Sequence, residues 1–239
     1  MSTPPTVQIK KPRRSVQQPG ALRNQASLEI QTRQAQALLS GRTGSAGIIG
    51  LMQFSHLATD VWHAAARDDP YADWVLLRIE AGIDKARAFM KEKNLKMVKS
   101  LNALGSMKIG LASTQAPAVV DLSFGTPYGF MGAYLLSDYD ELIRSVLTAE
   151  HCALLDRDRA GELIRAGGNV VRSAYQLPTA WRRTDITRDE VRKGSDAAAN
   201  AAQLMGELPV EVLELKQRPK FAPRIVRGGA DKGGGGKKG

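Results

Sequence analysis

The sequence has one cysteine, few aromatic residues and no long uncharged apolar run. The lone Cys152 excludes an internal disulfide and any zinc site built from several cysteines. Aromatic residues make up only 5% of the 239 residues, so the core must consist mainly of aliphatic side chains and methionine. No segment is apolar enough to cross a bilayer, and the N-terminus lacks the apolar core of a secretory signal. We therefore expect a cytoplasmic protein.

Motifs for nucleotide binding and catalysis are also lacking. The glycine-rich residues 41–44 lack the lysine and the following hydroxyl of a phosphate-binding loop. His56 and His63 are seven residues apart, and two histidines alone make a poor metal site, so they are expected to be ordinary surface or boundary histidines. His151 and Cys152 are adjacent, and adjacent side chains on a helix do not face each other. We therefore expect no enzymatic activity, no cofactor and no metal site.

Positive charge is concentrated at the two ends of the chain. The formal net charge is +10. Residues 1–26 contain five basic and no acidic residues, and residues 216–239 contain eight basic residues and one acidic residue. Both ends have compositions typical of disorder, and such tails either hold phosphates without reading sequence or simply keep a protein soluble. We predict a single globular, near-neutral domain over 27–215, between a disordered basic N-terminal arm and a disordered basic Gly/Lys-rich tail.

Within this domain, apolar residues recur mostly at helical spacing. The apolar stripe after Pro127 is broad, which implies burial against more than one neighbouring element. Asp69 followed by Pro70 is typical of a helix start, and Thr187 and Glu190 have the spacing of a capping box. Asp156 is a good N-cap for a further helix, and Gly167 with Gly168 is expected to interrupt that helix. The pattern predicts helices over 34–39, 51–66, 70–104, 128–147, 157–177 with that interruption, and 187–205.

Three short segments instead alternate between apolar and polar residues. Residues 27–33 place Leu28 and Ile30 on one face and polar side chains on the other. Residues 107–112 and 118–124 read as two further strands, and their short separation permits a hairpin. The predicted fold class is therefore α+β and mostly α, with long amphipathic helices and a small antiparallel sheet.

Several polar and basic residues are candidate DNA contacts. Gln31 and Arg33 lie on the polar face of the first predicted strand, and their side chains suit bases or phosphates. Residues 85–108 are locally basic, which indicates either a solvated helix face or a positive flank beside DNA. The candidate DNA-binding residues are Gln31, Arg33, Lys10, Lys11, Arg13, Arg14, Arg182 and Arg183.

Four segments carry a resemblance to a known family. They are GIIGLMQF (47–54), DDPYADWVLLRIE (68–80), TPYGFMGAYLLSDYDELIRSVLTAEHCALLDR (126–157) and GELPVEVLE (206–214). They are patches of fold-determining sequence rather than catalytic signatures. On these segments the chain resembles the integrating conjugative element proteins grouped with the AcaB-like transcriptional regulators, over about residues 27–224.

The resemblance implies a bacterial protein that is encoded on a mobile genetic element. It implies a DNA-binding, activator-like regulator of conjugative transfer genes. The implied partners are double-stranded DNA and a second copy of the chain, with no membrane and no small-molecule ligand. The near-neutral body motivates an alternative, a non-enzymatic structural or interaction protein of the element without sequence-specific DNA binding.

The resemblance also implies a ribbon-helix-helix-like element. Such an element needs a strand that pairs with its copy in a dimer and is followed by two helices. Residues 28–33 offer Gln31 and Arg33 as DNA contacts, and residues 118–124 are followed by the clearer helices. The outward face of the second candidate includes Asp121, whose charge is unfavourable against phosphates. The side chains favour residues 28–33 as the paired strand, whereas the order of strand and helices favours residues 118–124. Both strands therefore remain candidates.

Overall fold

A computed structural model describes residues 26–42 and 47–226. The described residues form eight α-helices, one 3-10 helix and a two-stranded antiparallel sheet, which confirms the mostly α, α+β class. None of the described helices is long and apolar enough to cross a membrane. The elements are β1 (Ala26–Ile30), α1 (Arg33–Ser40), α2 (Leu51–Ala66), α3 (Pro70–Asn102), β2 (Ala118–Leu122), α4 (Pro127–His151), α5 (Arg157–Gln176), η1 (Leu177–Ala180), α6 (Arg188–Arg192), α7 (Asp196–Met205) and α8 (Val210–Leu213).

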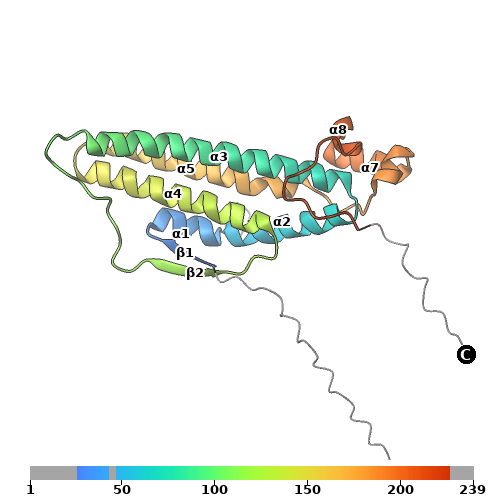
Figure 1. Cartoon of the computed structure of the whole chain (residues 1–239), viewed down its shortest axis with the longest axis horizontal. Coiled ribbons are helices and arrows are strands. Elements are labelled where there is room, and N and C mark those ends of the chain that lie inside the picture. The colour runs from blue at the N-terminus through green and yellow to red at the C-terminus, as the bar shows by residue number, and fades with distance from the viewer. Residues whose placement is uncertain (1–25, 43–46, 227–239) are drawn as a thin grey trace, which may run out of the picture.

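The four long helices α2 to α5 pack side by side as the body of the molecule (Figure 1). Short turns join α2 to α3 and α4 to α5, and each pair is antiparallel. The segment 103–126 instead crosses back along the body, so α3 and α4 run parallel. Their contacts advance together along both helices, from Glu80–Tyr128 through Arg87–Asp138 to Asn94–Glu141.

The predicted capping residues start these helices as expected. The Asp69 carboxylate accepts hydrogen bonds from the backbone N–H groups of Tyr71 (2.9 Å) and Ala72 (3.1 Å), and Pro70 occupies the first turn. Burial raises the pKa of Asp69, and the hydrogen bonds that it accepts oppose this rise. The Asp156 side chain caps α5 through the backbone N–H of Arg159 (2.9 Å). Both helix starts therefore follow from the local sequence.

The helix predicted over 187–205 is two helices. Thr187 and Glu190 form the predicted capping box at the start of α6. However, α6 ends at Arg192, and Gly194 adopts a φ of +64°. A positive φ does not continue an α-helix. The chain restarts as α7, where the Ser195 hydroxyl accepts from the backbone N–H of Ala198.

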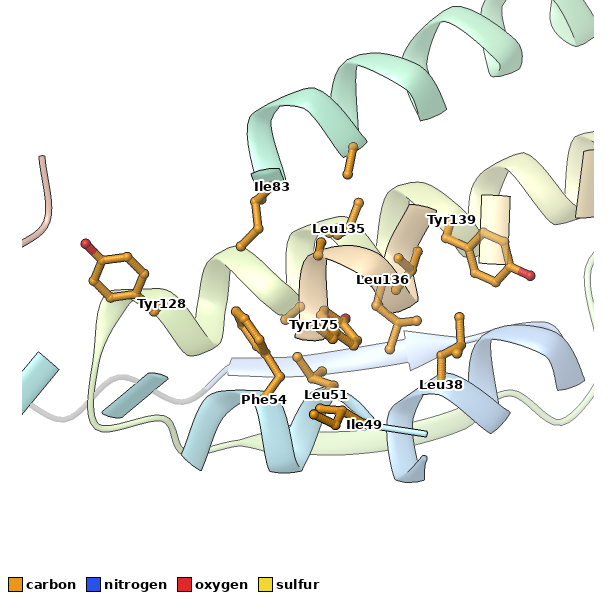
Figure 2. Packing of buried hydrophobic residues seen from close by; sticks show 14 of the residues in the cluster. Leu38, Ile49, Leu51, Phe54, Ile83, Tyr128, Leu135, Leu136, Tyr139 and Tyr175 are labelled. Atoms are coloured by element: carbon orange, nitrogen blue, oxygen red, sulfur yellow. The ribbon is translucent and has the colours of Figure 1, made fainter. Parts of the chain in front are cut away.

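The main core lies between α2, α3, α4 and α5, and α1 contributes Leu38 to it (Figure 2). Leu51 and Phe54 of α2 and Leu135 of α4 are fully buried, as is Tyr175 of α5. The Phe54 and Tyr175 rings stack with centroids 4.9 Å apart, and the Tyr175 hydroxyl donates to the Gly132 carbonyl (2.9 Å). The buried positions of α4 run along its whole length, which confirms the burial predicted from its broad stripe.

α5 continues through Gly167 and Gly168, so the interruption predicted there is wrong. Both glycines are buried against Tyr139 of α4. A Cβ atom at Gly167 would come within 2.8 Å of the Tyr139 ring. These glycines therefore permit close packing between α5 and α4, and that packing outweighs the low helix propensity of glycine.

Gly132 makes a comparable close contact, and we expect Gly132→Ala to destabilise the protein by about 1–3 kcal/mol. The added Cβ would lie 2.7 Å from the Phe54 ring and 2.9 Å from a Leu51 methyl, both in the closed core. Urea denaturation measures the loss. Gly125→Ala is the matched control, because a Cβ there meets nothing within 4 Å. Equal stability of the two variants would contradict this account of the packing.

The small sheet differs from the predicted hairpin. β1 pairs with β2 in antiparallel register, with Leu28 opposite Val120. Residues 107–112 form no strand, and Met107 is 63% exposed. β1 is the better partner for β2 because Leu28, Ile30 and Leu122 are all buried, so the pairing gives the sheet one apolar face over the helices.

Residues 216–226 belong to the packed body, so it continues beyond the boundary predicted at 215. The backbone N–H groups of Lys220 and Phe221 each donate to the Glu80 carboxylate at 3.1 Å. The Trp62 indole donates to the Phe221 carbonyl (3.0 Å), and the Val226 N–H donates to the Ala66 carbonyl (2.8 Å). The proline and lysine content of residues 216–226 resembles that of the following tail, which is why the boundary was placed too early. The hydrogen bonds hold this segment on α2 and α3. The tails predicted over 1–26 and 227–239 lie outside the described residues, apart from Ala26.

Candidate nucleic-acid interface

The exposed face of the β1–β2 ribbon is acidic. Ser27 and Glu29 of β1 lie opposite Asp121 and Val119 of β2, and all four side chains are exposed. The predicted alternation is therefore correct over residues 27–30 and 118–122. Two carboxylates without a basic residue make this face unfavourable against phosphates. The ribbon face alone does not supply an interface for nucleic acid.

Gln31 does not lie on the strand, contrary to prediction. β1 ends at Ile30 because Thr32 caps α1 and turns the chain. The Gln31 side-chain carbonyl accepts from the backbone N–H of Thr114 (2.9 Å), and its amide donates to Glu29. These internal hydrogen bonds occupy the amide that was expected to read a base.

Arg33 is the first residue of α1 rather than an outward strand residue. Its side chain is exposed, so its charge stays available to a ligand at the junction between β1 and α1. Of the two residues predicted on this strand, Arg33 is the better candidate for a phosphate contact.

Asp140 of α4 holds this junction in place. Asp140 is 4% exposed, and its carboxylate accepts from the backbone N–H groups of Gln31 and Thr32, both at 2.9 Å. It also accepts from the Thr32 hydroxyl (2.6 Å). Asp140 lies beside the buried stripe of α4, and that position is the only sequence signal for its role.

Asp140→Ala should therefore loosen the junction and lower the free energy of unfolding by about 2–4 kcal/mol. The substitution leaves two backbone donors and the Thr32 hydroxyl without their acceptor. Hydrogen exchange should accelerate first over 26–40. Glu141→Ala is the matched control, since Glu141 is exposed and accepts a single side-chain hydrogen bond from Asn94. Unchanged exchange over 26–40 would show that Asp140 does not hold this junction.

The candidates Arg182 and Arg183 are exposed, but both have partners within the chain. The Arg182 guanidinium folds back onto the carbonyl of Thr179, and Arg183 pairs with Asp185 at 3.3 Å. The adjacent Trp181 indole donates to Asp69 at the start of α3 (3.0 Å), which fixes this turn. The turn that contains Arg182 and Arg183 therefore lies beside the start of α3. Gln31 instead bonds to Asp140, which lies in the middle of α4. The structure does not bring the two groups together.

The second half of α3 carries several exposed basic residues. Lys85, Lys91, Lys96 and Lys99 are exposed. Glu92 offsets part of this charge, because it pairs with Lys96 (2.7 Å) and Lys93 (3.2 Å). The four basic residues predicted in the N-terminal arm lie outside the described residues: Lys10, Lys11, Arg13 and Arg14.

A buried ion network was missed by the sequence analysis. Arg188 has a side chain only 1% exposed, and it pairs with Asp73 (2.5 Å) and Asp68. Asp73 also pairs with Arg218 (3.0 Å) from the C-terminal segment. The network joins α6 and the C-terminal segment to the start of α3, so it has a structural role. Asp68 and Asp73 lie close to the helix cap at Asp69, which could have drawn attention to them. Their basic partners lie more than a hundred residues away in the sequence, so the pairing could not be predicted.

Glu80 and Tyr128 make a second buried link nearby. The Tyr128 hydroxyl donates to Glu80 at 2.8 Å, and the same carboxylate receives the backbone of the C-terminal segment. Burial raises the pKa of Tyr128 above its usual value, and the hydrogen bond to Glu80 raises it further. The phenol therefore stays protonated and can donate.

Comparison with known proteins identifies the family. The model of the family described as "Transcriptional regulator AcaB" matches residues 18–226. This chain belongs to the AcaB family. Among solved structures, the crystal structure of selenomethionine-containing AcaB from uropathogenic E. coli is similar, with a TM-score of 0.57 and 13% sequence identity. The similarity covers 82% of this chain and 98% of that chain, and at this identity it shows the shared fold. No curated protein matches the sequence.

Membership of the AcaB family confirms the resemblance found in the four sequence segments. The match spans every described element of the structure, from β1 to the C-terminal segment. The AcaB family is one of transcriptional regulators, which is not a class of enzyme.

Proposed function

We propose that this protein is a DNA-binding, activator-like regulator of conjugative transfer or integrating conjugative element genes. In this proposal it acts as a homodimer in the bacterial cytoplasm. The observation that carries the proposal is the AcaB family match over residues 18–226. A regulator of transcription acts at promoters, and double-stranded DNA is therefore the proposed partner.

The order of elements supports β1 as the strand that pairs across a dimer. β1 is followed directly by α1 and α2, as a ribbon-helix-helix-like element requires. β2 is followed by α4, whose buried face runs along its whole length. β1 hydrogen-bonds to β2 on one edge only, and among the described residues its other edge has no strand partner. A second copy pairing along that edge would extend the sheet to four strands.

Charge supports contact with phosphates outside the ribbon face. The acidic ribbon favours contact through Arg33, the exposed lysines of α3 and the basic residues at both chain ends. Basic residues bind phosphates in proportion to the number of contacts, irrespective of base sequence. Recognition of a specific DNA sequence also requires side chains that the dimer places in a groove of the DNA.

Chromatin immunoprecipitation of the tagged full chain from its host tests the proposal. We expect enrichment at promoters within the mobile element, together with lower transcript levels of the adjoining genes when the protein is deleted. Arg33→Ala should reduce the enrichment, and Arg159→Ala, an exposed arginine on α5, is the matched control. Uniform recovery of element and chromosomal DNA would overturn the proposal.

One observation favours a second candidate function. The body between the ends is near neutral and its ribbon face is acidic, which suits a structural or interaction protein of the element that binds no specific DNA. Co-purification with other proteins of the element would support this function, provided that deletion leaves the transcript levels unchanged.

A further inference from the structure

A hollow lies between α3 and α5, which pack side by side in the body (Figure 1). Its volume is about 370 Å³, which falls within the range of small-molecule sites in proteins. One face of each helix forms its wall, over residues 82–89 and 169–177. The ion networks at the start of α3 use none of its lining residues, so the hollow is a separate feature of the fold.

The floor of the hollow is apolar. Ala86 of α3 and Ala174 of α5 lie there, with only 2% and 3% of their surface exposed. The half-buried side chains of Phe89, Val170 and Leu177 surround them. Alanine is too small to fill the space between two helices, and the larger side chains around it leave the hollow open to solvent. The floor can therefore bury an apolar group of a ligand.

Three polar side chains at the rim have hydrogen-bond donors to spare. Lys85 of α3 is exposed and makes no hydrogen bond or ion pair to another described residue. The Ser173 hydroxyl of α5 likewise has no hydrogen-bond partner within the described ranges. Asn169, one turn earlier on α5, accepts from Arg172 (2.5 Å) through its side-chain carbonyl, which leaves its amide N–H groups to donate. The rim therefore offers an ammonium, an amide and a hydroxyl.

The charge at this rim is positive. Lys85 is the one charged residue that lines the hollow, and no carboxylate of the described chain lines it. The Arg172 guanidinium lies beside the rim, because it bonds to Asn169. A carboxylate only accepts hydrogen bonds, so it matches a set of donors that includes an ammonium group. The hollow therefore suits a ligand that joins one negative group to an apolar tail.

We propose that the hollow between α3 and α5 binds a small monocarboxylate that carries an apolar tail. The tail lies on the alanine floor, and the carboxylate accepts hydrogen bonds from Lys85 and the polar side chains of α5. Size and charge decide between occupants. A dimer interface needs about 800 Å² on each partner, whereas the apolar lining here is confined to a few side chains around one lysine. This ligand is distinct from the DNA of the proposed function.

Isothermal titration calorimetry of the full chain with octanoate tests the inference. Octanol and octylamine are titrated in parallel, because they keep an alkyl tail of the same length and replace the negative group by a neutral or a positive one. The wild type should bind octanoate at least about tenfold more tightly than either analogue, since a carboxylate gains charge-assisted hydrogen bonds at the rim.

Variants of the rim separate the role of charge from that of the apolar floor. Lys85→Met keeps most of the side-chain length and removes the charge, so it should weaken octanoate binding at least about tenfold and leave octanol binding unchanged. Ser173→Phe fills the hollow from an exposed position and should abolish the binding of octanoate and octanol. Lys99→Met is the matched control, because Lys99 is exposed on α3 outside the hollow. Thermal unfolding without ligand verifies that all variants are folded.

Three results would overturn the inference. The first is a wild type that binds no octanoate, or that binds octanoate and octylamine equally. The second is normal octanoate binding by folded Lys85→Met or Ser173→Phe. The third is a change from dimer to monomer in Ser173→Phe while the wild type binds no octanoate, which would assign the hollow to self-association. Binding of promoter duplexes is a separate readout, so the failure of this inference leaves the proposed function untouched.

Discussion

Replacing Arg188 with alanine should lower the free energy of unfolding by about 3–5 kcal/mol. Arg188 is buried and pairs with Asp73 and Asp68, and Asp73 has no exposed surface. Removing the guanidinium leaves carboxylates inside the protein with only Arg218 to compensate them, and it opens a cavity the size of an arginine side chain. Such uncompensated buried charge is among the largest effects of a single substitution.

Urea denaturation followed by circular dichroism measures this loss. Arg159→Ala is the control, because Arg159 is 76% exposed and lies 3.9 Å from an exposed Asp156. Its stability should stay within about 0.5 kcal/mol of the wild type. The network holds the C-terminal segment on α3 through Arg218, so Arg188→Ala should also expose this segment to trypsin cleavage after Lys220. A folded Arg188→Ala variant with wild-type stability would contradict the structural role of the network.

Removing residues 1–25 and 227–239 together should abolish most of the salt dependence of DNA binding. The two segments carry nine basic residues and one acidic residue, whereas the body is near neutral. Each phosphate contact contributes about 0.9 to the slope of log K against log salt concentration. If most of these residues contact phosphates, the slope should fall in magnitude by about 5–8, and non-specific affinity should fall at least about a hundredfold in low salt.

The two single truncations partition this effect between the ends. Removing residues 1–25 deletes five basic residues, and removing 227–239 deletes four, so the N-terminal truncation should reduce the slope at least as much. Titrations of a random-sequence duplex at four salt concentrations give the slopes. A double truncation that keeps the wild-type slope would assign phosphate contact to the body, with the exposed lysines of α3 as the first candidates.

Local signals in the sequence predicted most of the helices. The cap at Asp69 with Pro70, the cap at Asp156 and the capping box at Thr187 act within four residues, so they are legible without tertiary information. The break expected at Gly167 was wrong for a tertiary reason, because the glycines fit against Tyr139 of another helix. Propensity alone cannot register such a contact.

The candidate site was harder to predict because its geometry depends on distant residues. β2 pairs with a strand about ninety residues earlier, while the neighbouring segment 107–112 offered a shorter connection. Gln31 lost its expected role because Asp140 and Thr114 fix the turn that contains it. Phe221 lies against Phe124 and Phe130 near the start of α4, and the placement of the chain after Lys216 could not be read from its proline and lysine content. The family could be recognised from the sequence, because the resemblance rests on contiguous segments of the chain.

The affinity ratio between specific and unrelated DNA tests the central claim most directly. The full chain is titrated with a duplex from a promoter of its own mobile element and with a shuffled duplex of equal length, at a salt concentration of about 150 mM. If the protein is a DNA-binding regulator, the promoter duplex should bind at least about a thousandfold more tightly than the shuffled one. Equal dissociation constants for every element promoter and its shuffled counterpart would contradict the account.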